Sequence, residues 1–204
     1  MKPTIMIACL ALAFLFLPGI PPAGAILGIG EKELSEEEKQ ARIKKERAEI
    51  QTRVKETLGR LYQVQPRAKQ AVQNAEGYAV FSNFGMKLGI VGGGSGKGLA
   101  VNNKTGKETF MKMLEVQGGL GYGAKTFSQI FVFLTKGAFN NFVEQGWTFG
   151  GQATAAAKHE DTGESLQEAV AVAPGIYLYQ LTDTGLSAEL TAKGTKYYQN
   201  DDLN

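Results

Sequence analysis

The chain has few of the side chains that build catalytic and metal sites in proteins. Its 204 residues include one cysteine and one histidine. Cys9 lies inside the apolar N-terminal run, so the rest of the chain has no thiol nucleophile, disulfide or cysteine metal site. His159 stands alone in a polar stretch, and one histidine cannot form a multi-histidine metal centre. The sequence therefore predicts a protein that is not an enzyme and carries no metal or cofactor.

A strong excess of either charge is also absent. The chain has 22 Lys and Arg against 20 Asp and Glu, a net charge of +2. Removal of Lys2 with an N-terminal signal leaves +1, since one positive charge is lost from +2. Proteins that bind nucleic acids without a specific motif rely on a large basic excess. We therefore expect no nucleic-acid partner.

The first 25 residues have the order of a secretory signal peptide. Lys2 provides the positive start, and an apolar run covers residues 5–17. Prolines follow, and then Ala23-Gly24-Ala25 supplies the small residues that a signal peptidase recognises. The run is short for a bilayer span, which needs about 20 apolar residues. An uncleaved anchor is the alternative. We expect cleavage near Ala25 and an exported protein, either periplasmic or associated with the cell envelope.

A charged helical segment, residues 26–63, is expected to precede the main domain, residues 64–204. Ser35 followed by Glu38 is a capping box that predicts a helix start. Pro66 breaks the pattern, and a second short helix is expected to end at Gly77. Apolar residues recur at helical spacing through the first helix: Ile43, Ile50, Val54, Leu58 and Leu61. This stripe either packs on the domain or docks on a membrane or protein partner.

The rest of the chain is rich in glycine, aromatic and β-branched residues, which predicts strands joined by turns. The glycine cluster 92–98, between apolar runs 88–91 and 99–101, predicts a hairpin with Lys97 at its tip. A second turn is expected at residues 102–107. Further strands are expected at 109–116, 148–157, 176–181 and 186–191, and a short helix at 138–143. Residues 129–134 are expected to be either a buried strand or the start of a helix. The predicted fold class is α+β, with N-terminal helices followed by a glycine-rich, mainly antiparallel sheet.

The glycine cluster does not match a nucleotide-binding loop. The phosphate-loop pattern needs a glycine where Val91 stands and Ser or Thr where Gly98 stands. A flexible turn, in which glycine permits positive φ, explains the cluster without a ligand.

The order of motifs from residue 64 to the end resembles the SYLF domain family. An alanine-bearing helix leads into Gly77-Tyr78-Ala79-Val80-Phe81, and a glycine-rich stretch follows at 85–98. The middle and end, at 118–133 and 185–198, also fit the family's order. The resemblance implies a domain that binds anionic phospholipids or phosphoinositides at a membrane surface. A lone domain behind a signal peptide is similar to the bacterial exported members.

Residue roles at such a surface follow from simple electrostatics. Lysines near glycine can approach anionic head groups, each contributing about 1 kcal/mol at a membrane. The expected lipid-binding residues are Lys87, Lys97, Lys104, Lys107 and Lys125. Aromatic residues favour the interface, and the expected membrane-inserting ones are Phe84, Phe127 and Trp147. The alternative function is a structural envelope protein that binds a protein partner through residues 31–63.

Overall fold

The computed structural model describes residues 35–149, 166, 168–187 and 194–204, with the backbone alone at 83–92 and 117–126. Residues 1–34, with the expected signal peptide, lie outside the described residues. Two helices come first, α1 at Glu36–Val64 and α2 at Arg67–Asn74. They confirm the predicted long helix, the break at Pro66 and the short second helix. The buried residues of α1 are Ile50, Val54, Thr57 and Leu61, so the apolar stripe packs on the domain.

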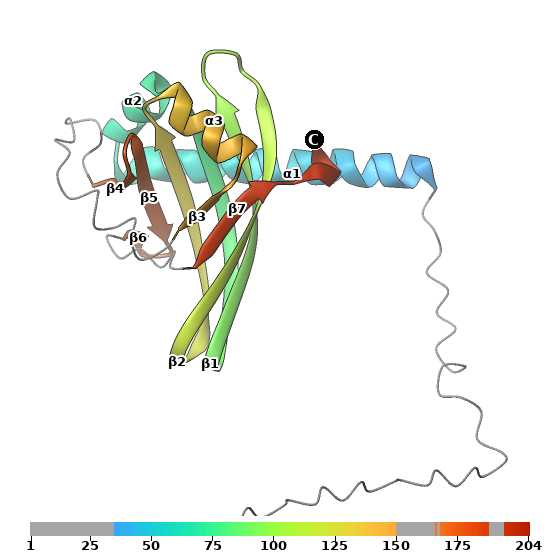
Figure 1. Cartoon of the computed structure of the whole chain (residues 1–204), viewed down its shortest axis with the longest axis vertical. Helices are drawn as coiled ribbons and strands as arrows, with labels where there is room; N and C mark the ends of the chain where they lie inside the picture. The colour runs from blue at the N-terminus through green and yellow to red at the C-terminus, as the bar shows by residue number, and fades with distance from the viewer. Residues whose placement is uncertain (1–34, 150–165, 167, 188–193) are drawn as a thin grey trace, which may run out of the picture. The chain divides into compact units, whose positions relative to one another are not determined.

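The described strands form one antiparallel sheet of seven strands. Two are very long, β1 at Gly77–Asn102 and β2 at Glu108–Phe133, and they pair along almost their whole length. The sheet order is β3-β7-β2-β5-β4, with β1 beside β2 and β6 beside β5. The short strands are β3 (Trp147–Phe149), β4 (Val170–Ala173), β5 (Ile176–Thr182), β6 (Gly185–Leu186) and β7 (Thr195–Gln199). Helix α3, at Lys136–Glu144, follows β2 (Figure 1). The α+β prediction is confirmed.

The glycine cluster is strand rather than turn, which corrects the predicted hairpin at 92–98. β1 runs through the cluster, and the hairpin connection is the second predicted turn, between Asn102 and Glu108. The two halves of β1 approach each other closely. A Cβ at Gly96 would lie 2.5 Å from the carbonyl oxygen of Ser82, and one at Gly77 would lie 2.7 Å from that of Val101. The β1–β2 ribbon thus folds back on itself, and glycine permits the contact.

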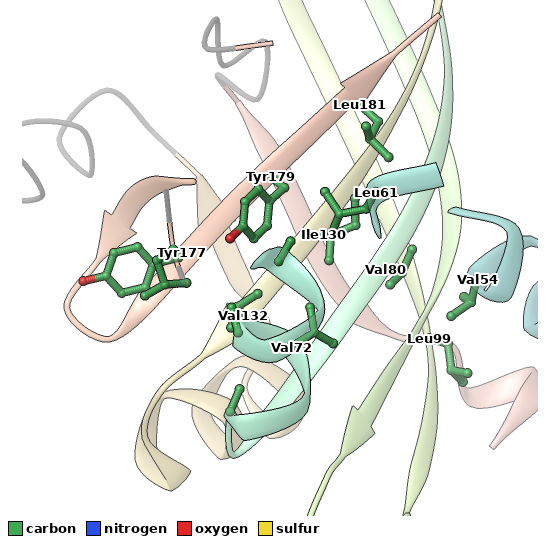
Figure 2. Close-up of a cluster of buried hydrophobic side chains, with 14 of the residues drawn as sticks. Val54, Leu61, Val72, Val80, Leu99, Ile130, Val132, Tyr177, Tyr179 and Leu181 are labelled. Carbon is green, nitrogen blue, oxygen red and sulfur yellow. The ribbon is translucent and has the colours of Figure 1, made fainter. Parts of the chain in front are cut away.

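Two hydrophobic clusters lie on the two faces of this curled sheet. The outer cluster joins α1 and α2 to the sheet, and Figure 2 shows Leu61 and Val72 among Val80, Ile130 and Val132. The inner cluster lies on the other face of the sheet and includes Phe139, Phe142 and Val143 of α3. Its largest side chains are aromatic: Phe81, Phe131, Phe133, Phe142, Phe149 and Tyr197.

Short strands at the end of the chain were only partly expected. The strand at 176–181 is confirmed as β5, and the helix at 138–143 as α3. β3 covers the start of the strand expected at 148–157, and residues 150–157 lie outside the described residues. The strand expected at 186–191 is described only as far as Leu186 in β6. No sequence signal led us to expect β4 or β7, whose apolar runs are short.

Candidate functional site

The structure does not bring the five expected lysines together. Lys97 lies within β1 rather than at a hairpin tip, directly opposite Lys112 of β2. Its Nζ is 2.7 Å from Oε1 of Glu46 in α1, so its charge is paired across the space between helix and sheet. An exposed lysine in an ion pair is a weaker attractant for a lipid head group than a free one. The assignment of Lys97 to a flexible tip is therefore corrected.

Lys104 and Lys107 lie at the turn between β1 and β2. Both are exposed, and the Nζ of Lys104 is 4.0 Å from Oε1 of Glu76. The turn is well fixed: Asn102 Oδ1 accepts hydrogen bonds from the backbone N–H groups of Lys104 and Thr105. These two lysines stand beside acidic residues on a rigid turn.

Lys87 and Lys125 lie near the middle of the same ribbon, where it folds back on itself. β5 pairs with β2 only from Ser128 to Phe133, and β7 only from Met111 to Glu115. Between these limits β2 pairs with β1 alone among the described strands. We call this two-stranded part of the ribbon, residues 83–92 and 117–126, the arm. In Figure 1 the lower ends of β1 and β2 extend beyond β5 and β7.

The composition of the arm differs from that of its surroundings. Its twenty residues contain Lys87 and Lys125 and no aspartate or glutamate. Some lysines elsewhere on the described surface are paired with carboxylates: Lys112 Nζ lies 2.7 Å from Oδ2 of Asp202, and Lys39 Nζ lies 2.7 Å from Oε1 of Glu36. The arm is therefore a locally cationic part of a nearly neutral protein.

The register of the arm separates its residues by face. Positions 84, 86 and 88 align with 126, 124 and 122, and positions 85, 87 and 89 align with 125, 123 and 121. Neighbouring positions in a strand belong to opposite faces. One face of the arm thus holds the apolar positions, and the other holds the two lysines among glycines. The residues of the apolar face are Phe84, Met86, Leu88, Tyr122, Ala124 and Thr126.

The aromatic residues expected at a membrane have different positions. Phe84 belongs to the apolar face of the arm by register. Phe127 is only 3% exposed and belongs to the inner cluster. Trp147 is half-buried, and its ring lies 5.8 Å from the ring of Phe131. In this conformation Phe127 and Trp147 pack within the protein, so their positions give no support to membrane insertion.

Sequence reasoning missed a group of exposed apolar side chains at the base of the arm. Val116 is 61% exposed, Leu114 is 49% exposed and Tyr198 of β7 is 36% exposed. The Nζ of Lys196 lies 6.0 Å from the ring centre of Tyr198. Buried Met111, Met113 and Glu115 alternate along β2 with these exposed positions, and this alternation predicted the strand at 109–116. Nothing in it indicated which of these side chains stay exposed in the folded protein.

The described residues were compared with the requirements for a membrane-spanning helix and for a metal-binding cluster. None of the described helices is both long and apolar enough to cross a bilayer. Within the described part of the chain, no three His, Cys, Asp or Glu side chains gather as a metal-binding cluster.

Comparison with known proteins identifies one informative relative. No family model matches the chain. The chain is 35% identical over 177 residues to a protein of Aeromonas veronii named Beta cell expansion factor A. The match covers 87% of this chain and 66% of the relative, so the chain spans just under two thirds of that protein's length.

Proposed function

We propose that the protein is exported and binds anionic phospholipid membranes through the arm, without catalysis. The observation that carries this proposal is the combination of charge and faces in the arm. It has two lysines, no acidic residue, and apolar positions collected on one face. Beta-strand pairing with other described strands ends before this region begins.

An amphipathic ribbon of this kind suits the membrane interface. Its apolar face would enter the boundary between head groups and acyl chains, as the apolar face of an interfacial helix does. Lysines on the other face would reach the phosphate level by extending their long side chains. Exposed Val116 and Leu114 continue the apolar contact at the base of the arm.

The sequence resemblance and the relative are compatible with this function. Resemblance to the SYLF domain implies anionic phospholipid or phosphoinositide ligands. The relative is named as a factor for beta cell expansion, and this name specifies no ligand. Export itself rests on the signal-peptide pattern of residues 1–25.

Co-sedimentation with vesicles tests the proposal. The mature chain, residues 26–204, is mixed with vesicles of neutral phosphatidylcholine and with vesicles that also contain phosphatidylglycerol. We expect binding to the anionic vesicles that weakens as salt is raised, because salt screens exposed charges. A folded protein that stays in the supernatant with both vesicles would contradict the proposal.

A structural envelope role through α1 is the second candidate. Residues 36–42 of α1 are all exposed, and Figure 1 shows this end of the helix extending past the sheet. These turns are exposed to a protein partner, whereas Ile50, Val54 and Leu61 are buried in the outer cluster. Loss of envelope association on deletion of residues 26–42, with vesicle binding intact, would favour this role.

A further inference from the structure

A groove of about 570 Å³ runs between α1 and the outer face of the sheet. Such a volume is in the range of small-ligand sites. One wall is the face of α1 that carries Glu46, Glu49, Ile50, Arg53 and Val54. The opposite wall comes from β1, β2 and β7: Val80, Ser82, Ser95, Gly96, Lys97, Lys112, Met113, Leu114 and Tyr198.

The floor of the groove is apolar. Ile50, Val54, Val80 and Met113 line it, and each is at most 6% exposed. Leu114 and Tyr198 stand at its edge with large exposed fractions. The apolar surface that water can reach is therefore that of Leu114 and Tyr198, and covering it releases water, which favours an occupant with a hydrocarbon part.

The rim of the groove is charged. Arg53, Lys97 and Lys112 provide three cations, and Glu46 and Glu49 provide two carboxylates. The ion pair between Lys97 Nζ and Glu46 Oε1, at 2.7 Å, connects the sheet wall to the helix wall. Lys112 is bound to Asp202 at 2.7 Å. Glu46 therefore occupies the position at Lys97 that an anionic ligand would take.

We propose that this groove binds a single-chain anionic amphiphile, such as a fatty acid. The hydrocarbon chain lies on the apolar floor, and the anionic head replaces the Glu46 carboxylate at Lys97, with Arg53 on the same rim. The exchange is accessible from solution, because the Lys97 side chain is 54% exposed and solvent weakens its pair with Glu46. This site goes beyond the proposed membrane function, since no residue of the arm lines it and it takes a ligand from solution.

Calorimetry with laurate below its micelle concentration tests the groove. Dodecyltrimethylammonium, which has the same chain and the opposite charge, is the matched control ligand. We expect one laurate per protein and at least tenfold weaker binding of the cation, because the head group must pair with Lys97. No laurate binding, or equal binding of both amphiphiles, would overturn the proposal.

Two variants of the same ion pair separate a ligand role from a structural one. E46Q and K97Q both remove the pair between α1 and β1, so a purely structural role predicts similar changes in both. The proposal predicts opposite changes: E46Q removes the competitor and raises laurate affinity several-fold, and K97Q lowers it about tenfold. Changes in the same direction would overturn it.

A third variant tests whether the ligand lies in the groove, and a fourth separates this site from the arm. S95W places a large ring in the groove from an exposed strand position, and we expect it to abolish laurate binding in a folded protein. K87E/K125E alters only the arm and should bind laurate normally. Laurate binding that survives S95W would contradict the site, whatever the vesicle experiment shows.

Discussion

Glycine has two different roles in this chain. The two roles are distinguished by the atoms that an added side chain would contact at each position. At Gly98 an added Cβ would overlap the carbonyl oxygen of Val80 and the ring of Phe81. At Gly59, in the middle of α1, an added Cβ meets nothing within 4 Å. The sequence identifies both glycines but predicts only a turn for the cluster. Close approach of two distant strand segments leaves no local signal that distinguishes it from a turn.

Alanine at these two glycines should therefore change stability in opposite directions. We expect Gly98→Ala to lower the free energy of unfolding by about 1–3 kcal/mol, as overpacking does. Gly59→Ala should raise it by about 0.5–1 kcal/mol, because alanine loses less entropy in a helix. Urea unfolding followed by circular dichroism measures both. A Gly98→Ala protein as stable as the parent would contradict the close contact between the halves of β1.

At the scale of elements, α2 and the β1–β2 turn are joined by one side chain. The Nδ2 of Asn103 donates to the carbonyl oxygens of Val72 at 2.7 Å and Ala75 at 2.9 Å. These carbonyls belong to the helix end, where no further turn supplies a donor. The local signals predicted both elements, since helical spacing ends before Gly77 and the run 102–107 is rich in turn residues. Their contact is long-range, so sequence spacing could not predict it.

Removal of this bridge should destabilise the protein measurably. We expect Asn103→Ala to cost about 1–3 kcal/mol, because two carbonyl groups lose their donor in a partly buried place. Lys104→Ala, one residue further along the exposed turn, should stay within about 0.5 kcal/mol of the parent. Thermal unfolding compares the two variants. Equal melting temperatures for both would show that the bridge contributes nothing.

At the scale of the whole molecule, the fold depends on neutral tyrosines in and around both clusters. Burial raises the pKa of Tyr62 and of Tyr179 to about 12, with smaller effects from Tyr78 and Glu168 respectively. Burial also raises the pKa of Tyr78 and of Tyr197, with Glu108 and Glu115 acting in the same direction. Tyr197 donates a hydrogen bond to Oε1 of Gln129 at 2.6 Å, which gives its buried hydroxyl group a partner inside the inner cluster.

These raised pKa values predict unfolding in alkali. Above pH 10 the unfolded chain loses tyrosine protons that the folded protein keeps. The contribution of these tyrosines to the free energy of unfolding is therefore fully present below pH 10 and is lost as pH rises toward 12. Tyrosinate absorbance and circular dichroism should therefore change together in this range. Titration of all tyrosines near pH 10 with the fold intact would contradict the buried environments.

The candidate site was partly predictable from sequence at this scale. Lys87, Lys125 and Phe84 were identified as residues beside glycines, and the register then placed them on one arm. Lys97, Lys104 and Lys107 have the same local signals, yet they lie elsewhere because the ribbon is continuous through the glycine cluster. Strand register depends on pairing between distant segments, which the composition of one segment does not encode.

The central claim, that the arm is the membrane-binding end, has a direct test in two matched double variants. K87E/K125E reverses both charges on the arm, and K104E/K107E makes the same charge change at the turn between β1 and β2. Each is sedimented with anionic vesicles at low salt. The account predicts that K87E/K125E loses most of its vesicle binding, while K104E/K107E keeps binding close to that of the parent. Equal loss in both variants, or loss only in K104E/K107E, would contradict it.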